Sequence, residues 1–164
     1  MAEKKENKGN VTFADIKAMY EGGMMGLTSR TLDIAHAYKV SSFKTKLKNA
    51  YQEMDSRRLQ LVKDAGIEDG NAHDKRLREL SVNKQRTEAE ELEFKELVAK
   101  NEAFKGLYEQ LLQDRYEIEP KTMPFGEWMK LQEANKDIKF GNCEVLAQFE
   151  TLLEGILWAA PEEK

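Results

Sequence analysis

Cysteine, proline and histidine are all scarce in this sequence. One cysteine, Cys143, stands among 164 residues, which excludes an internal disulfide and a cysteine-rich zinc site. A single cysteine is also typical of proteins from a reducing compartment. Only three prolines are present, two of them close together at Pro120 and Pro124. So little proline over this length favours a mainly helical fold.

Long apolar runs are also missing, and no segment approaches the length needed to span a membrane. The first residues, MAEKKENKGN, are charged, so we expect residues 1–10 to be a disordered tail that is neither a signal peptide nor an anchor. We expect residues 11–160 to form a single helical domain, because a chain of this length can bury a core without metal or disulfide. The expected location is the cytoplasm, with no membrane partner.

Charge, in contrast, is abundant and unevenly distributed. Charged residues make up 34% of the chain, and the net charge is −4. Residues 1–66 carry 12 Lys and Arg against 8 Asp and Glu, whereas residues 67–164 carry 14 against 22. We favour a basic half that packs against an acidic half, and a basic surface for nucleic acid is the alternative.

The stretch YEGGMMGLTSR (20–30) superficially looks like a phosphate-binding loop. Such a loop needs a preceding strand, a fixed glycine spacing and a lysine before its Ser or Thr. Here an amphipathic helix precedes the stretch, and Leu27 stands where the lysine should be. The pattern therefore indicates a turn between two helices, with Thr28 or Ser29 as the next helix cap.

Two helices are expected in the first 66 residues. The first begins at Thr12, where Asp15 completes a variant of the capping box, and ends at Gly22. The second begins near Ser29 and ends at Gly66, a residue suited to a left-handed C-cap. Its stripe of mostly apolar side chains repeats with alternating spacings of four and three residues, which is a coiled-coil heptad pattern. The stripe comprises His36, Val40, Phe43, Leu47, Ala50, Met54, Arg57 and Leu61.

A second long helical stretch is expected from about 74 to 113, antiparallel to the first. Its outer part is nearly all polar, and Thr87 with Glu90 forms a capping box that would restart a helix there. In this antiparallel arrangement Arg57 falls opposite Asn83. We interpret the polar part as a weakly packed, wet layer or, alternatively, as the place where a partner binds.

The pattern changes after residue 114. Residues 115–124 alternate apolar and charged side chains and indicate a short edge strand. A short helix is expected to begin at Pro124, and residues 138–140 are expected to pair with the first extended piece. A last apolar helix is capped by Asn142. The predicted fold is mainly α: a long antiparallel, coiled-coil-like helical hairpin packed with shorter N- and C-terminal helices, and at most a minor two-stranded β element.

No residue pattern indicates a catalytic, cofactor or metal site. The two histidines, His36 on a helix and His73 in a loop, do not form the His-Glu-x-x-His pattern of zinc proteases. The acidic residues around Gly70 lack the ligand alternation of a calcium loop. Cys143, at the expected start of the last helix, is the one candidate nucleophile, and no catalytic signature surrounds it. We therefore expect a protein that is not an enzyme and needs no cofactor or metal.

Two candidate binding surfaces follow from the patterning. The first is a partner or self-association surface, whose methionines are expected either to enter the core or to adapt to a partner. Its residues are Met24, Met25, Arg57, Arg58, Asn83 and Glu90. The second is a row of lysines that would contact phosphates in a nucleic acid. The row comprises Lys39, Lys44, Lys46 and Lys48.

The order of these patterns over residues 43–157 resembles a family of short uncharacterised proteins of tailed bacteriophages and prophages, a domain family of unknown function. The resemblance implies a phage origin and no assigned activity, so no functional residue carries over. The matching segments are LKNAYQEMDSRRLQLVKDAGIEDGN, EELEFKELVAKNEAFKGLYEQLL, RYEIEPKTMPFGEW and VLAQFETLLEGIL.

These observations favour a non-enzymatic, phage-type interaction protein, either a structural assembly factor or a modulator of a host protein. Its expected partner is a virion protein, a host protein or a second copy of the chain, and its expected location is the host cytoplasm or the virion. The alternative is a nucleic-acid-associated protein. It would bind DNA through the basic helix 39–63 or, as an acidic DNA mimic, inhibit a nuclease.

Overall fold

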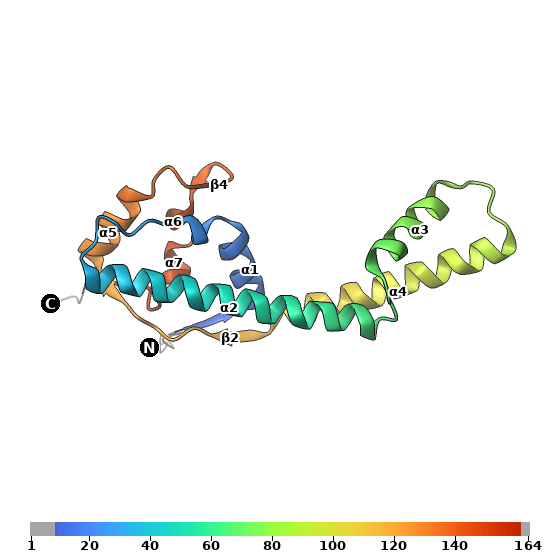
Figure 1. The fold of residues 1–164 in the computed structure, drawn as a ribbon, viewed down its shortest axis with the longest axis horizontal. Helices are drawn as coiled ribbons and strands as arrows, with labels where there is room; N and C mark the ends of the chain where they lie inside the picture. Colours follow the sequence, from blue (N-terminus) through green and yellow to red (C-terminus); the bar gives the residue numbers. More distant parts are fainter. Residues whose placement is uncertain (1–8, 162–164) are drawn as a thin grey trace, which may run out of the picture. The chain divides into compact units, whose positions relative to one another are not determined.

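The computed structural model describes residues 9–161 and shows a mainly α fold (Figure 1). Helices account for 65% of the structure, and the strands form only small two-stranded sheets, which confirms the predicted fold class. Residues 1–8 of the expected tail lie outside the described residues, whereas Asn10 already belongs to a strand. The elements are β1 (Asn10–Thr12), α1 (Phe13–Glu21), the 3-10 helix η1 (Met24–Gly26), α2 (Ile34–Asp64), α3 (Gly70–Val82), α4 (Glu88–Gln113), β2 (Arg115–Glu117), β3 (Met123–Pro124), α5 (Phe125–Ala134), β4 (Lys139–Phe140), β5 (Cys143–Glu144), α6 (Val145–Gln148), α7 (Glu150–Leu153) and β6 (Trp158–Ala159).

The chain divides into two compact units. Unit 1 comprises Met1–Glu53 and Asp114–Lys164, and unit 2 comprises Met54–Gln113. Helix α2 contributes residues to both units. The expectation of one domain over residues 11–160 stays a prediction. Within residues 9–161, no helix combines the length and the hydropathy that crossing a membrane requires.

The start of unit 1 is organised around Thr12. The Thr12 hydroxyl accepts a hydrogen bond from the backbone N–H of Asp15 (3.2 Å), and the Asp15 carboxylate accepts one from the backbone N–H of Thr12 (2.9 Å). These reciprocal bonds confirm the predicted capping box. Helix α1 ends as predicted before Gly22, and Gly23 then adopts a φ of 103°, which only glycine reaches without strain.

Helix α2 begins at Ile34, so the prediction that it begins near Ser29 is wrong. Asp33 takes the capping position instead. Its Oδ1 accepts the backbone N–H of His36 (3.0 Å), and its backbone oxygen accepts the N–H of Ala37 (2.8 Å). A carboxylate and a serine hydroxyl can both satisfy a free helix N–H at this place. Only the carboxylate also carries a charge that interacts favourably with the helix dipole.

The C-terminal end of α2 is confirmed at Gly66, which has a φ of 76°. The N–H of Gly66 donates to the backbone oxygen of Lys63 (2.8 Å), and the N–H of Ile67 donates to that of Val62 (3.1 Å). This pair of bonds is the Schellman pattern that ends many helices. Ile67, the residue after this glycine, is 5% exposed.

The core of unit 1 contains the heptad stripe of α2 from Val40 to Ala50, which is buried as its spacing predicts. Helix α5 supplies Trp128, which is fully buried and stacks on Trp158 with the ring centroids 5.7 Å apart. Other fully buried large side chains in this unit include Phe13, Ile16, Met19, Met24, Leu47, Ile118, Met123, Leu131 and Leu153.

The extended segments of unit 1 form three two-stranded sheets within the described part of the chain. Strand β1 pairs antiparallel with β2, β3 pairs parallel with β6, and β4 pairs antiparallel with β5. The β content is small as predicted, but the expected pairing of residues 115–124 with residues 138–140 is wrong. Each end of the 115–124 segment instead finds a partner from a distant part of the chain.

The predicted last helix, capped by Asn142, is not continuous. Cys143 lies in β5, and the helical residues are divided between α6 and α7. Gly155, with a φ of 79°, then turns the chain so that Trp158 enters β6. The Trp158 indole N–H donates to the backbone oxygen of Glu150 (3.0 Å). Burial of this tryptophan and the glycine turn therefore override the helical pattern.

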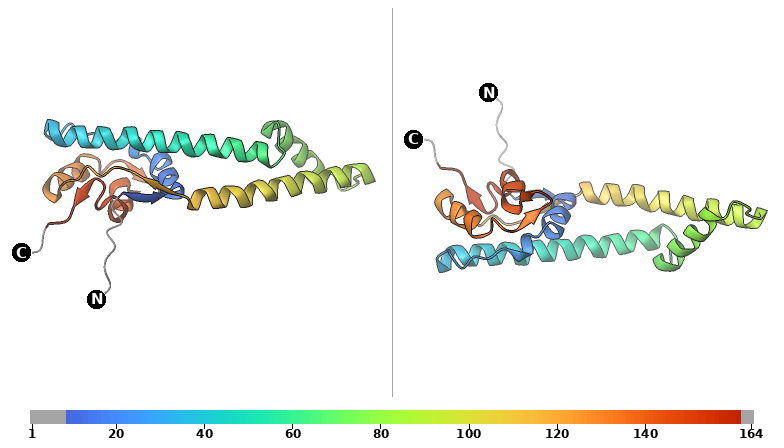
Figure 2. Two further views of the ribbon diagram at one scale, coloured as in Figure 1. Left: turned by 90° about the horizontal axis from the view of Figure 1, so that it is seen from below. Right: turned by 90° about the horizontal axis from the view of Figure 1, so that it is seen from above.

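Unit 2 consists of the end of α2 together with α3 and α4. The stretch predicted as one helix over 74–113 is two helices, joined by residues 83–87. The polar segment is this connection, so its interpretation as a wet layer between two long helices is wrong. Helices α3 and α4 lie side by side (Figures 1 and 2), and His73 Nε2 lies 3.0 Å from Asn101 Oδ1 across them.

Candidate partner-binding surface

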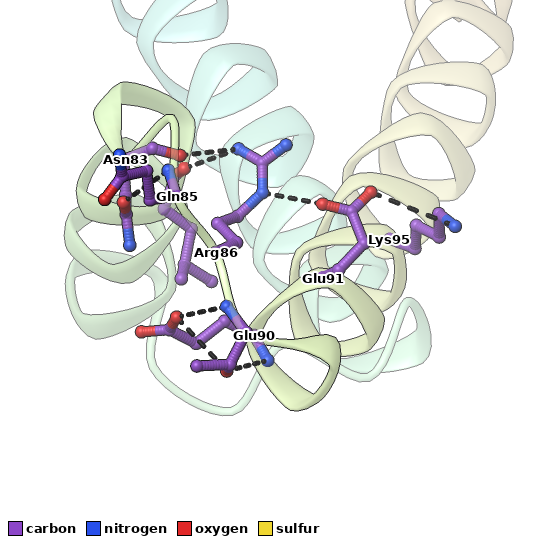
Figure 3. Close-up of polar contacts among 8 residues, drawn as sticks. Asn83, Gln85, Arg86, Glu90, Glu91 and Lys95 are labelled. Carbon is purple, nitrogen blue, oxygen red and sulfur yellow. Dashed lines mark hydrogen bonds and ion pairs between the residues drawn. The ribbon is translucent and has the colours of Figure 1, made fainter.

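Residues 83–87 connect α3 to α4 and are called here the α3–α4 turn (Figure 3). Asn83 is the C-cap of α3 and leaves the helical conformation, with φ −78° and ψ 106°. Its side-chain oxygen accepts the backbone N–H of Gln85 (3.0 Å). Asparagine favours such turns because its side chain can replace a backbone partner two residues along the chain.

Arg86 links the turn to both helices. Its Nη1 donates to the backbone oxygens of Leu80 (2.7 Å) and Asn83 (3.3 Å), which satisfies carbonyl groups at the end of α3. Its Nε donates to Glu91 Oε2 in α4 (2.7 Å), and the guanidinium carbon lies 4.3 Å from the centroid of the Phe94 ring. One side chain therefore joins the end of α3 to the start of α4.

Helix α4 begins with the capping box that the sequence predicts. The Thr87 hydroxyl accepts the backbone N–H of Glu90 (3.2 Å), and the Glu90 carboxylate accepts the backbone N–H of Thr87 (2.9 Å). The next carboxylate, Glu91, bonds to Arg86, and this hydrogen bond holds the pKa of Glu91 below its ordinary value. The acidic first turn also suits the positive end of the helix dipole.

A bidentate ion pair joins α3 and α4. Arg76 donates from Nε to Glu93 Oε1 (2.8 Å) and from Nη2 to Glu93 Oε2 (2.6 Å). The hydrogen bonds from Arg76 lower the pKa of Glu93 and, in return, the pKa of Arg76 is raised. Such paired bonds fix geometry as well as charge, so they set the register of the two helices.

A shallow depression of about 490 Å³ lies beside the α3–α4 turn. Leu92, which is 69% exposed, is one of its lining residues, and Val82, the last residue of α3 before the turn, is 77% exposed. Leu92 lines the depression among charged groups. The full lining is Lys84, Arg86, Thr87, Glu88, Glu91 and Leu92.

The structure places the predicted partner-surface residues in different units. Asn83 and Glu90 both lie in unit 2, on either side of the α3–α4 turn. Met24 belongs to the core of unit 1 and is 0% exposed, so its assignment to a partner surface is wrong. Burial of its flexible side chain fills the core beside a glycine turn, which is the alternative that the sequence left open. Met25 is half-buried in unit 1.

The two arginines of the predicted surface lie on the part of α2 that belongs to unit 2. Arg57 is exposed, and Arg58 is half-buried. The Nε of Arg58 donates to Asp55 Oδ1 (2.8 Å), one turn earlier on the same helix. Their role in binding a partner stays a prediction.

Most of the predicted phosphate-contacting lysines have structural contacts within unit 1. Lys39 Nζ donates to the backbone oxygen of Thr122 (2.7 Å), and Lys44 Nζ donates to that of Leu27 (2.9 Å). Lys46 forms an ion pair with Glu119. Lys48 is exposed. A lysine that already caps a carbonyl or pairs with a carboxylate has fewer N–H donors free for a phosphate, and its position is set by the existing contact.

Cys143 and the two histidines lie at separate places in unit 1 and unit 2. Cys143 is exposed and lies in β5, directly before Glu144, the N-cap of the four-residue helix α6, and not at the start of one long last helix. His73 faces Asn101. His36, in contrast, lies close to Asp33 and Glu127.

Sequence reasoning missed the residues that give the turn its shape. Arg86 was not singled out, although an arginine just after a helix end is well placed to bond the last carbonyl groups. Leu92 falls outside the apolar stripe of α4, and a large apolar residue off the stripe is a signal that could have been used. Val82 gave no such signal, because its exposure depends on the helix end at residue 83.

Comparison with known proteins gives no match: no family model, no curated protein and no solved structure is similar to this chain.

Proposed function

We propose that this protein is a non-enzymatic interaction protein and that the α3–α4 turn is its main contact surface. The observation that carries the proposal is the exposure of Leu92 in the lining of the depression, together with the exposure of Val82 at the end of α3, directly before the turn. Large apolar side chains surrounded by charged groups are typical of the centre and rim of a binding site.

The rigidity of the turn supports this proposal. Asn83, Arg86 and Glu90 are all held by bonds to backbone groups of the same unit (Figure 3). A surface that is ordered before binding loses little conformational entropy when the partner docks. These bonds order the backbone of the turn and of the first residues of α4, the helix that carries Leu92.

The partner that we propose is a virion or host protein, or a second copy of the chain. The support for a phage-type protein is the order of sequence patterns over residues 43–157, which resembles the order in a family of phage and prophage proteins. An assembly factor or a modulator of a host protein fits this origin, and both act through protein contacts.

The alternative is a nucleic-acid-associated protein that uses the lysines of α2, or a DNA mimic that uses the acidic half. The contacts of Lys39, Lys44 and Lys46 with groups of unit 1 argue against the first form. Direct DNA binding would weaken steeply with salt, because each neutralised phosphate releases counterions. DNA mimicry would instead appear as inhibition of a nuclease without any binding to DNA.

The test is affinity capture from the native host with the wild type and two variants, together with the mass of the purified protein in solution. Leu92→Asp places a charge in the proposed contact surface, and Leu59→Asp is the matched control on α2, where Leu59 is 50% exposed. We expect the wild type and Leu59→Asp to bind a stoichiometric partner, which is either another protein or a second copy of the chain. Leu92→Asp should lose it, with an affinity at least about thirtyfold lower.

Two results would overturn the proposal. One is a partner that Leu92→Asp retains as well as the wild type does. The other is salt-sensitive nucleic acid as the captured species with no accompanying protein, which would favour the alternative.

A further inference from the structure

Three potential metal ligands gather in unit 1, where the start of α2 lies beside α5 (Figures 1 and 2). Asp33 immediately precedes α2, His36 lies in its first turn, and Glu127 lies in the first turn of α5. One ligand atom from each side chain lies within 4.8 Å of the ligand atoms of the other two. Asp33 and His36 are neighbours at the start of α2, and the fold brings Glu127 of α5 to them.

The carboxylates of this cluster each use one oxygen in a structural contact. Asp33 Oδ1 caps α2 by accepting the N–H of His36, which leaves Oδ2 3.6 Å from His36 Nε2. Glu127 Oε1 accepts a hydrogen bond from Lys130 Nζ (2.6 Å). The second oxygen of each carboxylate therefore remains available for a cation.

Two atoms of the cluster are buried without a hydrogen-bond partner among the described residues: His36 Nδ1 and Glu127 Oε2. Buried polar atoms nearly always have a partner, because an unsatisfied one has lost its bonds to water without replacement. The side chains of His36 and Glu127 are 17% and 18% exposed, so solvent reaches little of either. The cluster therefore combines an unpaired imidazole nitrogen, Nδ1, with an unpaired carboxylate oxygen, and the second imidazole nitrogen, Nε2, faces Asp33 Oδ2.

We propose that Asp33, His36 and Glu127 bind one divalent transition-metal ion, with zinc as the representative of its class. One imidazole nitrogen and two carboxylate oxygens form a donor set that suits zinc and its neighbours better than magnesium or calcium, which take oxygen ligands. Three protein ligands leave a coordination position for water. The two carboxylates and the ammonium of Lys130 sum to one negative charge, which favours a cation.

Metal binding requires a modest movement of these side chains. Zinc lies about 2.0–2.2 Å from its nitrogen and oxygen ligands in a tetrahedral arrangement, so two ligand atoms on one ion are about 3.3–3.6 Å apart. The spacing in the cluster reaches up to 4.8 Å, and rotation of exposed Asp33 or of Glu127 closes this difference. The ion would then join the start of α2 to α5. This inference concerns unit 1 only and is independent of the proposed contact surface in unit 2.

The alternative explanation of the cluster is a set of ion pairs that needs no metal, with His36 between two carboxylates. The two explanations differ in the role of Lys130. In an ion-pair cluster Lys130 is a stabilising partner of Glu127. In a metal site Lys130 competes with the ion for Glu127, so its removal strengthens metal binding.

The test is a titration of tag-free, metal-free, full-length protein with zinc by calorimetry, and with cobalt by absorption spectroscopy. We expect saturable binding of one ion per chain and a rise of the melting temperature with zinc. His36→Gln, Glu127→Gln and Asp33→Asn should each weaken binding by at least about tenfold. Asp33→Asn is informative because asparagine still caps the helix.

The chain offers matched controls for each ligand type. His73→Gln removes the other histidine, and Cys143→Ser removes the exposed thiol, and neither should change zinc affinity. Lys130→Gln should tighten binding severalfold. Absence of saturable zinc binding by the wild type would overturn the proposal. A His36→Gln variant that binds zinc with the affinity of the wild type would also overturn it. If His36→Gln fails to fold, a Lys130→Gln variant that binds zinc no more tightly than the wild type would overturn the proposal instead.

Discussion

Asn135 shows how a single buried polar side chain can tie a loop to a helix. It is 3% exposed at the C-cap of α5, and its side-chain oxygen accepts the backbone N–H of Thr28 (2.7 Å). Its amide nitrogen donates to the backbone oxygens of Thr28 (2.9 Å) and Leu131 (2.8 Å). The amide thus satisfies three backbone groups at once, which no other side chain of this size does as well.

Removal of the Asn135 amide should therefore be costly. Asn135→Ala is expected to lower the free energy of unfolding by about 3 kcal/mol, since it leaves buried backbone groups without partners. Denaturant unfolding followed by tryptophan fluorescence measures this change, because Trp128 and Trp158 both lie in unit 1. Asn49→Ala, at an exposed position of α2, should change the stability by less than about 0.5 kcal/mol. Equal effects of the two substitutions would contradict the role assigned to Asn135.

Glycine at position 66 is required by backbone conformation and not by space. A Cβ atom at Gly66 would lie 3.5 Å from Lys100 Cε, an ordinary contact, but the φ of 76° is strained for alanine. We expect Gly66→Ala to destabilise the protein by about 1 kcal/mol. Gly106, in the middle of α4, has open space around its Cα, so Gly106→Ala should stabilise by about 1 kcal/mol. Thermal unfolding of the two variants checks this prediction, and a shift of both in the same direction would refute it.

At the scale of elements, the pairing of α3 with α4 depends on two carboxylates that must be ionised to form their ion pairs with arginines. Arg76 and Arg86 hold the pKa values of Glu93 and Glu91 below their ordinary 4.5. For a carboxylate with a lowered folded-state pKa, the stabilisation is fully present above the unfolded-state pKa. It is lost as the pH falls through the folded-state pKa. The ion pairs should therefore support the helix pairing at neutral pH and fail in acid.

This pH dependence can be measured with Arg76→Gln. We expect the variant to melt at a lower temperature than the wild type at about pH 7, and the difference to shrink as the pH falls from about 4.5 towards 3. Circular dichroism at several pH values follows both proteins. Arg78→Gln, at an exposed position of α3, is the control and should melt like the wild type throughout. A difference between Arg76→Gln and the wild type that grows in acid would contradict the assignment.

Helix boundaries that rest on local signals could be predicted from the sequence. The capping boxes at Thr12 and Thr87 and the left-handed end at Gly66 involve residues within a few positions of one another, and the structure contains all three. The start of α2 was misplaced because Ser29 and Asp33 are both good caps and the choice between them depends on tertiary packing.

Strand partners and the candidate sites could not be predicted in the same way. The pairing of β3 with β6 joins residues 123–124 to residues 158–159, and the energy of such pairing depends on neighbours that the local pattern does not identify. The cluster of Asp33, His36 and Glu127 was unpredictable for the same reason. Core packing, and not the spacing of residues in the sequence, brings α5 to the start of α2. Asn83 and Glu90 do lie in one region, because they flank one turn, and their role in binding a partner stays a prediction.

At the scale of the whole molecule, buried side chains are distributed unequally between the two units. Unit 1 contains most of the fully buried large side chains, among them Trp128, which stacks on Trp158. In unit 2 the buried apolar residues of the described structure are Met54, Ile67, Leu80 and Leu111. Since burial of apolar surface is the main source of stability, each element of unit 2 is stabilised by few side chains.

We therefore expect unit 2 to open locally more often than unit 1. Hydrogen exchange followed by mass spectrometry at neutral pH should show slow exchange for α1, α5 and residues 40–50 of α2. Exchange should be faster for α3 and for α4 near the turn, because local opening there breaks few apolar contacts. Binding of a partner at the α3–α4 turn would slow exchange in these two helices and leave the protection of α1 and α5 unchanged. Uniform protection across both units would mean that the two units unfold together as one cooperative body. Unit 2 would then have no separate local opening equilibrium that binding of a partner could shift.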